Sequence, residues 1–113
     1  MVTPAISTVV LVRFPFSDLS ASKLRPAVVL AAAGRGDWVL CQITSNPYAD
    51  TVAVRIEDTD FANGSLQRIS YARPGKLFTA NAELIAAELG RLKPEKYQKI
   101  ITAVVALLEN RAP

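Results

Sequence analysis

The sequence contains no histidine at all. This absence removes the side chain that most often acts as a general base or binds a metal at neutral pH, so any catalysis must use other groups. Cysteine occurs once, as Cys41, which rules out an internal disulfide and favours a reducing compartment. Residues 1–8 carry no basic residue, unlike the start of a signal peptide. We therefore expect a cytoplasmic location.

Long apolar runs are also missing. The longest uncharged apolar stretches, residues 26–34 and 100–108, are too short to span a membrane, so we expect no membrane partner. The amino-acid composition is typical of one soluble domain over residues 1–113, because half of the residues are apolar and 20% are charged. The net charge of +3 permits a polyanionic partner without demanding one.

Alternating and β-branched segments predict a mainly β protein. Strands are expected at residues 9–16, 26–33, 38–44, 51–57, 67–71 and 76–79. In the fourth of these, Val52, Val54 and Ile56 fall on one face, which is typical of a half-buried antiparallel strand. The segment that follows it, EDTDFANGS, is predicted to be a loop.

Helices are predicted only after the strands. Asn81 can cap a short helix through Glu88 that ends at Gly90. Pro94 suits the first turn of a second helix. The apolar stripe of this helix comprises Tyr97, Ile100, Ile101, Val104, Val105 and Leu108. This order of elements predicts a small, strongly bent antiparallel sheet or open barrel covered by a C-terminal α-helix.

The second and third predicted strands are joined by GRGD, a hairpin signal that also sets their register. We predict that Arg25 lies opposite Thr44 at the open end of this hairpin. The same register pairs Ala27 with Gln42, Val29 with Leu40 and Ala31 with Trp38 on one face, and Pro26 with Ile43, Val28 with Cys41 and Leu30 with Val39 on the other. The second face is nearly all apolar and is expected to be core, whereas Arg25 lies on the first, less apolar face.

Arg25 and Thr44 would together suit a phosphate group. A guanidinium is planar and always protonated, and its forked donors match phosphate oxygens. A neighbouring hydroxyl adds a donor or an acceptor, and a core hairpin would hold both groups in a fixed orientation. The alternative is that Arg25 merely ends a strand in solvent and that Thr44 is an ordinary strand residue.

Three further features have simpler structural interpretations. The EDTD segment, residues 57–60, lacks the spacing of a calcium loop and is expected to be a solvated turn, so no metal or other cofactor is predicted. Cys41 alternates onto the core face, which predicts a buried, inert thiol. Three lysines at helical spacing, Lys93, Lys96 and Lys99, are expected to form a solvated helix face.

The aromatic residues near the hairpin leave two interpretations open. Trp38 and Phe14 or Phe16 can stack on nucleic-acid bases. Equally, Trp38 can pack at a subunit interface, and the two phenylalanines can pack beneath the loop between the first two strands.

Several motifs, in this order, resemble those of the MazF/PemK family of toxins from bacterial toxin–antitoxin pairs. They are VVLVRFPFSDLSASKLRPAVVL, VLCQITSN, GSLQRISYARPGKLFTAN and ELGRLKPEKYQKIITAVVALL. The resemblance covers nearly the whole chain and implies an SH3-like open antiparallel barrel of the MazF/PemK/CcdB type that forms a homodimer. It also implies a metal-independent endoribonuclease that cuts single-stranded RNA at short sequences, and an antitoxin protein that occupies its RNA-binding surface.

The resemblance also implies which residues form the site. The arginine of the family's Arg-Pro motif falls on Arg25, and its strand-end threonine falls on Thr44. Arg25 would then stabilise negative charge on the phosphate and can protonate the leaving 5′-oxygen, while Thr44 would position a phosphate oxygen or the 2′-hydroxyl. Further contacts with RNA are expected from Lys23, Arg73, Ser20 and Ser45.

Three positions depart from the family's pattern. Ser7 and Thr8 stand where a Gly-Asp pair is usual, the loop SDLSASKL is short and has no glutamate or histidine, and Gly75 replaces an aspartate that often follows the second arginine. Two alternative functions stay open. One is a gyrase-poisoning or other protein-targeting toxin of the same fold, and the other, given these departures, is a catalytically weak RNA-binding or regulatory relative.

Overall fold

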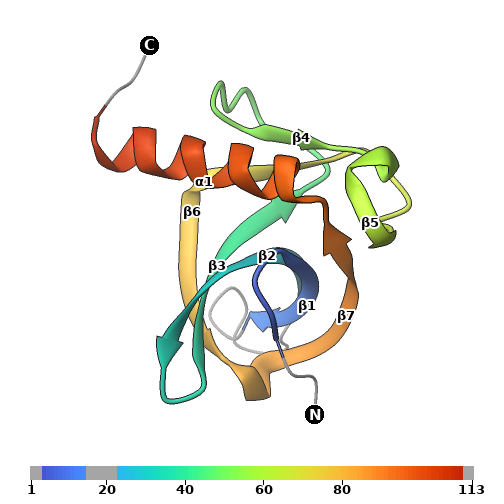
Figure 1. The fold of residues 1–113 in the computed structure, drawn as a ribbon, viewed down its shortest axis with the longest axis vertical. Coiled ribbons are helices and arrows are strands. Elements are labelled where there is room, and N and C mark those ends of the chain that lie inside the picture. Colours follow the sequence, from blue (N-terminus) through green and yellow to red (C-terminus); the bar gives the residue numbers. More distant parts are fainter. Residues whose placement is uncertain (1–3, 15–22, 111–113) are drawn as a thin grey trace.

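The computed structural model describes residues 4–14 and 23–110, and within these ranges seven strands form one antiparallel sheet (Figure 1). The strands are β1 (Thr8–Phe14), β2 (Lys23–Gly34), β3 (Asp37–Thr44), β4 (Val54–Ile56), β5 (Phe61–Gly64), β6 (Ser70–Asn81) and β7 (Ile85–Leu92). Their order in the sheet is β4-β6-β3-β2-β1-β7-β5. Two short 3₁₀ turns, η1 (Asp58–Asp60) and η2 (Ala82–Leu84), precede β5 and β7, and the helix α1 (Pro94–Leu108) follows β7.

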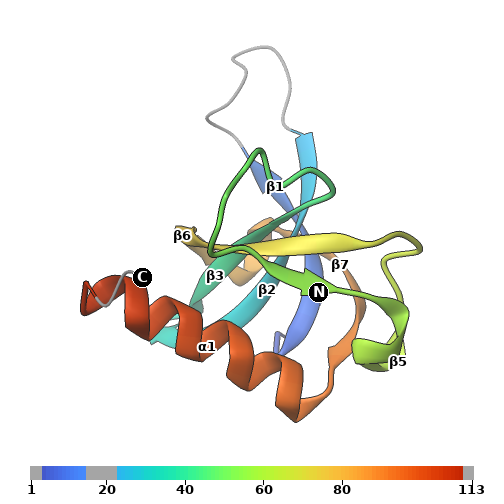
Figure 2. The same ribbon diagram turned by 90° about the horizontal axis from the view of Figure 1, so that it is seen from above.

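The sheet curls strongly, so that β6 and β7 lie on opposite sides of β1–β3 and α1 crosses beside β6 and β4 (Figures 1 and 2). This arrangement confirms the prediction of a mainly β protein in which an open antiparallel barrel is followed by a C-terminal helix. The helix begins at Pro94, as predicted. Ile100 and Val104 are its buried residues, whereas Val105 and Leu108, also predicted to pack, are 41% and 71% exposed.

Both faces of the central strands are buried, in two separate cores. The first core lies beneath α1 and includes Val28, Cys41 and Ile100. The second core lies inside the curl of the sheet and includes Val29 and Leu40. The face of the β2–β3 hairpin that was predicted to be the less apolar one is therefore core as well, because a sheet that curls around itself covers the face that the helix does not reach.

The predicted hairpin register is confirmed where the ladder is regular, with Ala27 opposite Gln42 and Val28 opposite Cys41. It fails nearer the turn, because the pairing shifts after Val29 and places Ala31 opposite Val39 instead of Trp38. At this shift, the Leu30 carbonyl accepts a hydrogen bond of 2.7 Å from the Tyr97 hydroxyl of α1. A bulge of this kind adds one residue to one strand and bends it, which suits a closing barrel.

Three predictions between the hairpin and α1 were wrong in their boundaries. The strand expected at 51–57 is only β4, because Asp50 forms a turn in which its carboxylate and carbonyl accept the amides of Val52 and Ala53. The loop expected after it contains η1 and the strand β5. The strands expected at 67–71 and 76–79 are one strand, β6, which pairs with both β3 and β4.

The helix predicted from Asn81 to Glu88 is not formed. Asn81 does act as a cap, since its side chain accepts the amide of Glu83 at 3.0 Å, but it caps only η2. The following residues form β7, which pairs with β1 and β5. Gly90 lies within β7, where a side chain would come within 2.5 Å of the Asn63 carbonyl oxygen of β5. Pairing on two edges therefore overrides the local helical signal.

Candidate active site

A cleft of about 330 Å³ opens where β2 begins and β3 ends. Its lining residues come from five segments: Leu11, Arg25, Pro26, Ile43, Thr44, Ser45, Leu66, Arg68, Ser70 and Leu89. Arg25, Thr44 and Ser45, which were expected at the site from the hairpin and the family resemblance, therefore line one cavity. Among its apolar lining residues, Ile43 belongs to the first core, and Leu66 and Leu89 pack against that core.

Two arginines border this cleft. Arg25 extends from β2 and Arg68 from the segment just before β6, and both are exposed. Among residues 4–14 and 23–110, neither guanidinium has an ion pair or a side-chain hydrogen bond. Their donors are thus open to an anionic ligand, and a pair of guanidiniums on one cleft is well suited to the oxygens of a phosphate.

The Thr44 hydroxyl is held by its own loop. It donates to the Asn46 carbonyl at 3.0 Å and accepts the Asn46 amide at 3.2 Å. The Asn46 side chain in turn accepts the amide of Tyr48 at 3.0 Å, and Tyr48 has a left-handed φ of 51° and a 70% exposed ring. Since its proton is engaged, the Thr44 oxygen can offer a ligand its remaining lone pair, which makes it an acceptor in a fixed position.

Arg73, the second arginine predicted for RNA binding, does not line the cleft. Its Nε lies 2.9 Å from Asp50 Oδ2, and the two side chains are only 23% and 13% exposed. The hydrogen bond from Arg73 lowers the pKa of the Asp50 carboxyl. This ion pair ties β6 to the loop that follows Thr44, so Arg73 supports the cleft's rim through Asp50, while its predicted contact with RNA stays a prediction.

Arg68 is the site residue that was not foreseen from the sequence. It fell within a strand predicted at 67–71, although the strand actually begins at Ser70. Arg68 thus lies just before the start of β6, much as Lys23 and Arg25 lie at the start of β2. A cation at the start of a strand was therefore the feature of the sequence that could have identified Arg68 as a site residue. Which of the two arginines near β6 reaches the cleft depends on the Asp50 pair, and that pair cannot be foreseen from spacing.

The other predicted RNA contacts are distributed differently. Lys23 is exposed at the start of β2, paired across the ladder with Phe14, and does not line the cleft. Ser20 and Phe16 lie outside the described residues, as does most of the short loop that differs from the family's pattern. Ser45 lines the cleft next to Thr44. Of the five predicted site residues that the structure describes, three therefore line the cleft: Arg25, Thr44 and Ser45.

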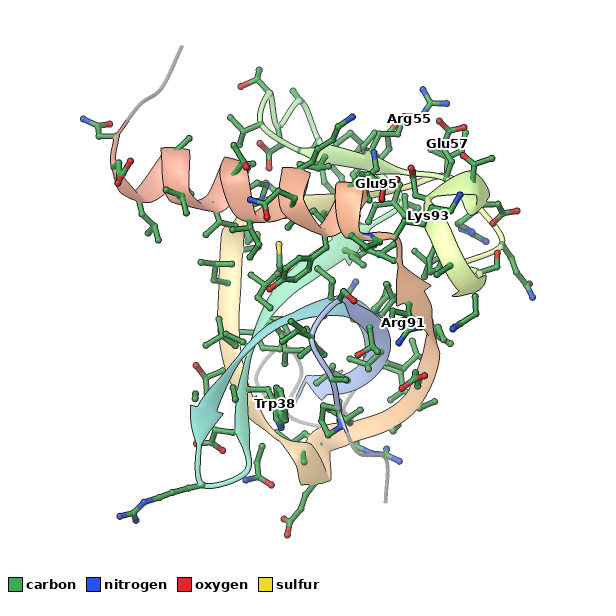
Figure 3. All side chains as sticks on the ribbon, viewed as in Figure 1. Trp38, Arg55, Glu57, Arg91, Lys93 and Glu95 are labelled. Atoms are coloured by element: carbon green, nitrogen blue, oxygen red, sulfur yellow. The ribbon has the colours of Figure 1, made fainter. Side chains whose placement is uncertain are left out.

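Cys41 and Trp38 are buried or half-buried in the two cores, whereas one of the lysines expected to be solvated is not. Cys41 is confirmed as a buried thiol: its Sγ donates to the Arg73 carbonyl at 3.1 Å, and burial raises its pKa to about 12. Trp38 is half-buried and packs on the second core, with its ring inside the curl of the sheet (Figure 3). The prediction of a solvated lysine face is wrong for Lys96, whose side chain is 14% exposed and reaches the Arg55 carbonyl at 3.0 Å and Asp60 at 3.5 Å.

The acidic EDTD segment forms the 3₁₀ turn η1 and its flank. Asp60 accepts the Glu57 amide at 2.8 Å, and Asp58 accepts the Ser65 hydroxyl, so these carboxylates already serve local structure. Across the described part of the chain, no cluster of three acidic or cysteine side chains is arranged to hold a metal ion. None of the helices in that part has the length and apolarity needed to cross a membrane.

Comparison with known proteins agrees with this fold. Residues 7–108 match the family of PemK-like, MazF-like toxins of type II toxin–antitoxin systems. No curated protein sequence matches the chain significantly. A MazE-MazF structure from Deinococcus radiodurans superposes with a TM-score of 0.75 at 17% identity, covering 96% of this chain and 98% of that one.

Two mycobacterial structures superpose as well. An endoribonuclease in complex with its cognate antitoxin gives a TM-score of 0.71 at 18% identity and covers 96% of both chains. A second structure described as an endoribonuclease gives a TM-score of 0.70 at 20% identity, covering all of this chain and 98% of that one. The structural likenesses show the fold, and the family match extends over nearly the whole sequence. The chain therefore belongs to the family of PemK-like, MazF-like toxins of type II toxin–antitoxin systems.

Proposed function

We propose that this protein is an endoribonuclease that cuts single-stranded RNA at short sequences without a metal ion. The observation that carries the proposal is the convergence of Arg25, Thr44 and Arg68 on one cleft. Two cations without an ion pair in the described part of the chain, beside a fixed hydroxyl oxygen, suit a phosphodiester and its neighbouring ribose. Structural neighbours described as endoribonucleases support the same function.

The reaction follows from the chemistry of these groups. The ribose 2′-oxygen attacks the adjacent phosphorus, the bond from phosphorus to the 5′-oxygen breaks, and the products end in a 2′,3′-cyclic phosphate and a 5′-hydroxyl. Arg25 stabilises the charge that gathers on the non-bridging oxygens and can protonate the leaving 5′-oxygen, and Arg68 adds a second cation. Because the Thr44 proton is engaged with Asn46, its oxygen is suited to accept a hydrogen bond from the 2′-hydroxyl, whose proton finally passes to solvent.

The absence of histidine limits the groups that can accelerate the cleavage reaction. With no imidazole to act as acid or base, orientation of the 2′-hydroxyl and stabilisation of the phosphate supply most of the acceleration. DNA lacks the 2′-hydroxyl and should not be cut. We further propose that the protein acts in the cytoplasm as a homodimer, and that a cognate antitoxin covers the cleft, as a partner for a toxin of this family.

A protein-targeting function is the second candidate, and the end of α1 favours it. Val105, Leu107 and Leu108 are 41%, 43% and 71% exposed on one terminal turn. Exposed apolar residues that gather in one place are typical of a surface that binds another protein. In this alternative, the helix end binds a target such as gyrase, and the arginines of the cleft are not needed.

One experiment separates the two candidates. The purified protein, free of antitoxin, is incubated with a mixed-sequence single-stranded RNA and its DNA counterpart in the presence of EDTA. The proposal predicts that only the RNA is cut and that the fragments carry cyclic-phosphate ends, which mass spectrometry identifies. Intact RNA would refute the ribonuclease proposal, and a Leu108→Ser variant that loses toxicity in cells would then support the protein-targeting alternative.

A further inference from the structure

A second cavity, of about 260 Å³, adjoins the candidate active site. It is lined by Glu57, Asp58, Thr59, Gln67, Arg68 and Ile69. Arg68 belongs to both cavities, so the two share one wall. A ligand that extends past Arg68 from the first cavity would therefore enter the second.

Two lining residues of the second cavity, Asp58 and Gln67, are connected by a chain of hydrogen bonds through Ser65. The Ser65 hydroxyl donates to Asp58 Oδ1 at 2.5 Å and accepts the Gln67 amide at 2.8 Å. Gln67 itself adopts a left-handed φ of 64°, which is unfavourable for a residue with a side chain. The fold thus maintains Gln67 in a strained conformation at the edge of the cavity instead of placing a glycine there.

The charges of the two cavities differ. Among the residues that the structure describes, the lining of the first cavity contains two arginines and no carboxylate, whereas that of the second contains Glu57 and Asp58 besides Arg68. Glu57 is about half exposed and lies 3.5 Å from Arg55, at the outer rim of the molecule (Figure 3). The carboxylates disfavour a phosphate in the second cavity, whereas Arg25 and Arg68 together favour a phosphate in the first. The second cavity therefore suits an uncharged group that donates hydrogen bonds.

We propose that this second cavity binds the base of the nucleotide next to the cleaved phosphate, and that it selects a base with an exocyclic amino group. Adenine, cytosine and guanine have such a group, and uracil does not. The amino group would donate to the side-chain carbonyl of Gln67 and to a carboxylate of Asp58 or Glu57, and Ile69, 44% exposed, would contact the ring. The identity of the ligand as RNA rests on the proposed function.

The variant Gln67→Gly tests the proposal without destabilising the fold. Glycine accepts a positive φ readily, so the backbone strain is relieved while the side chain that reads the base is removed. Gln98→Ala is the matched control, because Gln98 is exposed on α1 and hydrogen-bonds only weakly, at 3.4 Å, to Thr102. Wild type and both variants digest an RNA pool of random sequence, and the cleaved positions are sequenced.

We expect that uracil is depleted at one position beside the scissile bond in the RNA cut by wild type and by Gln98→Ala. For Gln67→Gly, the ratio by which the enzyme discriminates against uracil at that position should fall at least fivefold. Preference at the other positions should not change. Cleavage by Gln67→Gly with an unaltered sequence preference would overturn the inference while leaving the ribonuclease function intact.

A binding measurement separates failure of the inference from failure of the proposed function. AMP, CMP, GMP and UMP are titrated into the wild-type protein, and the Ile69 methyl signals are followed by NMR. The first three nucleotides should shift these signals and UMP should shift them at least fivefold less, even if the protein cuts no RNA. Equal shifts by all four nucleotides, or no shift by any, would overturn the inference.

Discussion

The ion pair between Asp50 and Arg73 gives a quantitative test of how the loop after Thr44 is held. In Asp50→Ala, the charged hydrogen bond from Arg73 is lost, and so is the 3.1 Å bond from the Val52 amide. A hydrogen bond to a charged group contributes about 1.5–3 kcal/mol and a neutral one about 0.5–1.5 kcal/mol. Since both side chains are mostly buried, we expect the free energy of unfolding to fall by roughly 2–4 kcal/mol.

Urea denaturation followed by circular dichroism measures this loss. Glu57→Ala is the control, because its ion pair with Arg55 is about half exposed and should contribute less than about 1 kcal/mol. A loss below about 0.5 kcal/mol in Asp50→Ala would mean that solvent screens the pair as it screens a surface ion pair. The proposal that this pair holds the loop would then be refuted.

The same pair should make stability depend on pH in one direction. Arg73 lowers the pKa of Asp50, so the carboxylate stabilises the fold above the pKa that it has in the unfolded chain, about 4. This contribution is lost as the pH falls through the lowered pKa of the folded state. The stability difference between wild type and Asp50→Ala should therefore be constant near neutral pH and shrink below about pH 4. A difference that instead grows in acid would contradict this assignment.

Three further changes test separate parts of the structure. Arg68→Ala should weaken binding of a single-stranded RNA with a non-cleavable 2′-deoxy linkage, and the slope of log affinity against log salt should fall by about 0.7, the value for one phosphate contact; an unchanged slope would place Arg68 outside the RNA path. Thr44→Val should lower the cleavage rate about 3–10-fold, the equivalent of one hydrogen bond, while Thr44→Ser should retain it; equal losses in both variants would show that the hydroxyl is not involved. Gly90→Ala should cost roughly 1–3 kcal/mol in a thermal unfolding experiment, because its side chain would collide with the Asn63 carbonyl; an unchanged melting temperature would show that β5 can move away.

The features predicted correctly from the sequence depend on local signals. The short GRGD turn and the alternation on either side of it set the register from Ala27 to Val29, and extending that register is enough to place Arg25 and Thr44 at the same end of the hairpin, where both line the cleft. The family resemblance pointed to the same two residues. The helix α1 was found because Pro94 and a stripe of apolar residues mark its start and its buried face.

The features that were missed depend on contacts between distant segments. The sequence NAELIAAELG contains strong helix formers after a capping residue, yet it forms β7 because β1 and β5 pair with both of its edges. The bulge at Leu30 accompanies a hydrogen bond to Tyr97, 67 residues later in the chain. Likewise, the family resemblance pointed to Arg73, and the spacing of the residues does not reveal that Arg73 forms an ion pair with Asp50.

The central claim is that the guanidinium of Arg25 stabilises the transition state of RNA cleavage. It is tested most directly by the single-turnover cleavage rate of an RNA oligonucleotide, with EDTA present, for wild type and Arg25→Ala. Arg55→Ala serves as control, because Arg55 is an exposed arginine that does not line the cleft. The claim predicts that Arg25→Ala loses at least about 100-fold in rate with an unchanged melting temperature, and that Arg55→Ala cuts like wild type. Equal rates for wild type and Arg25→Ala would contradict it.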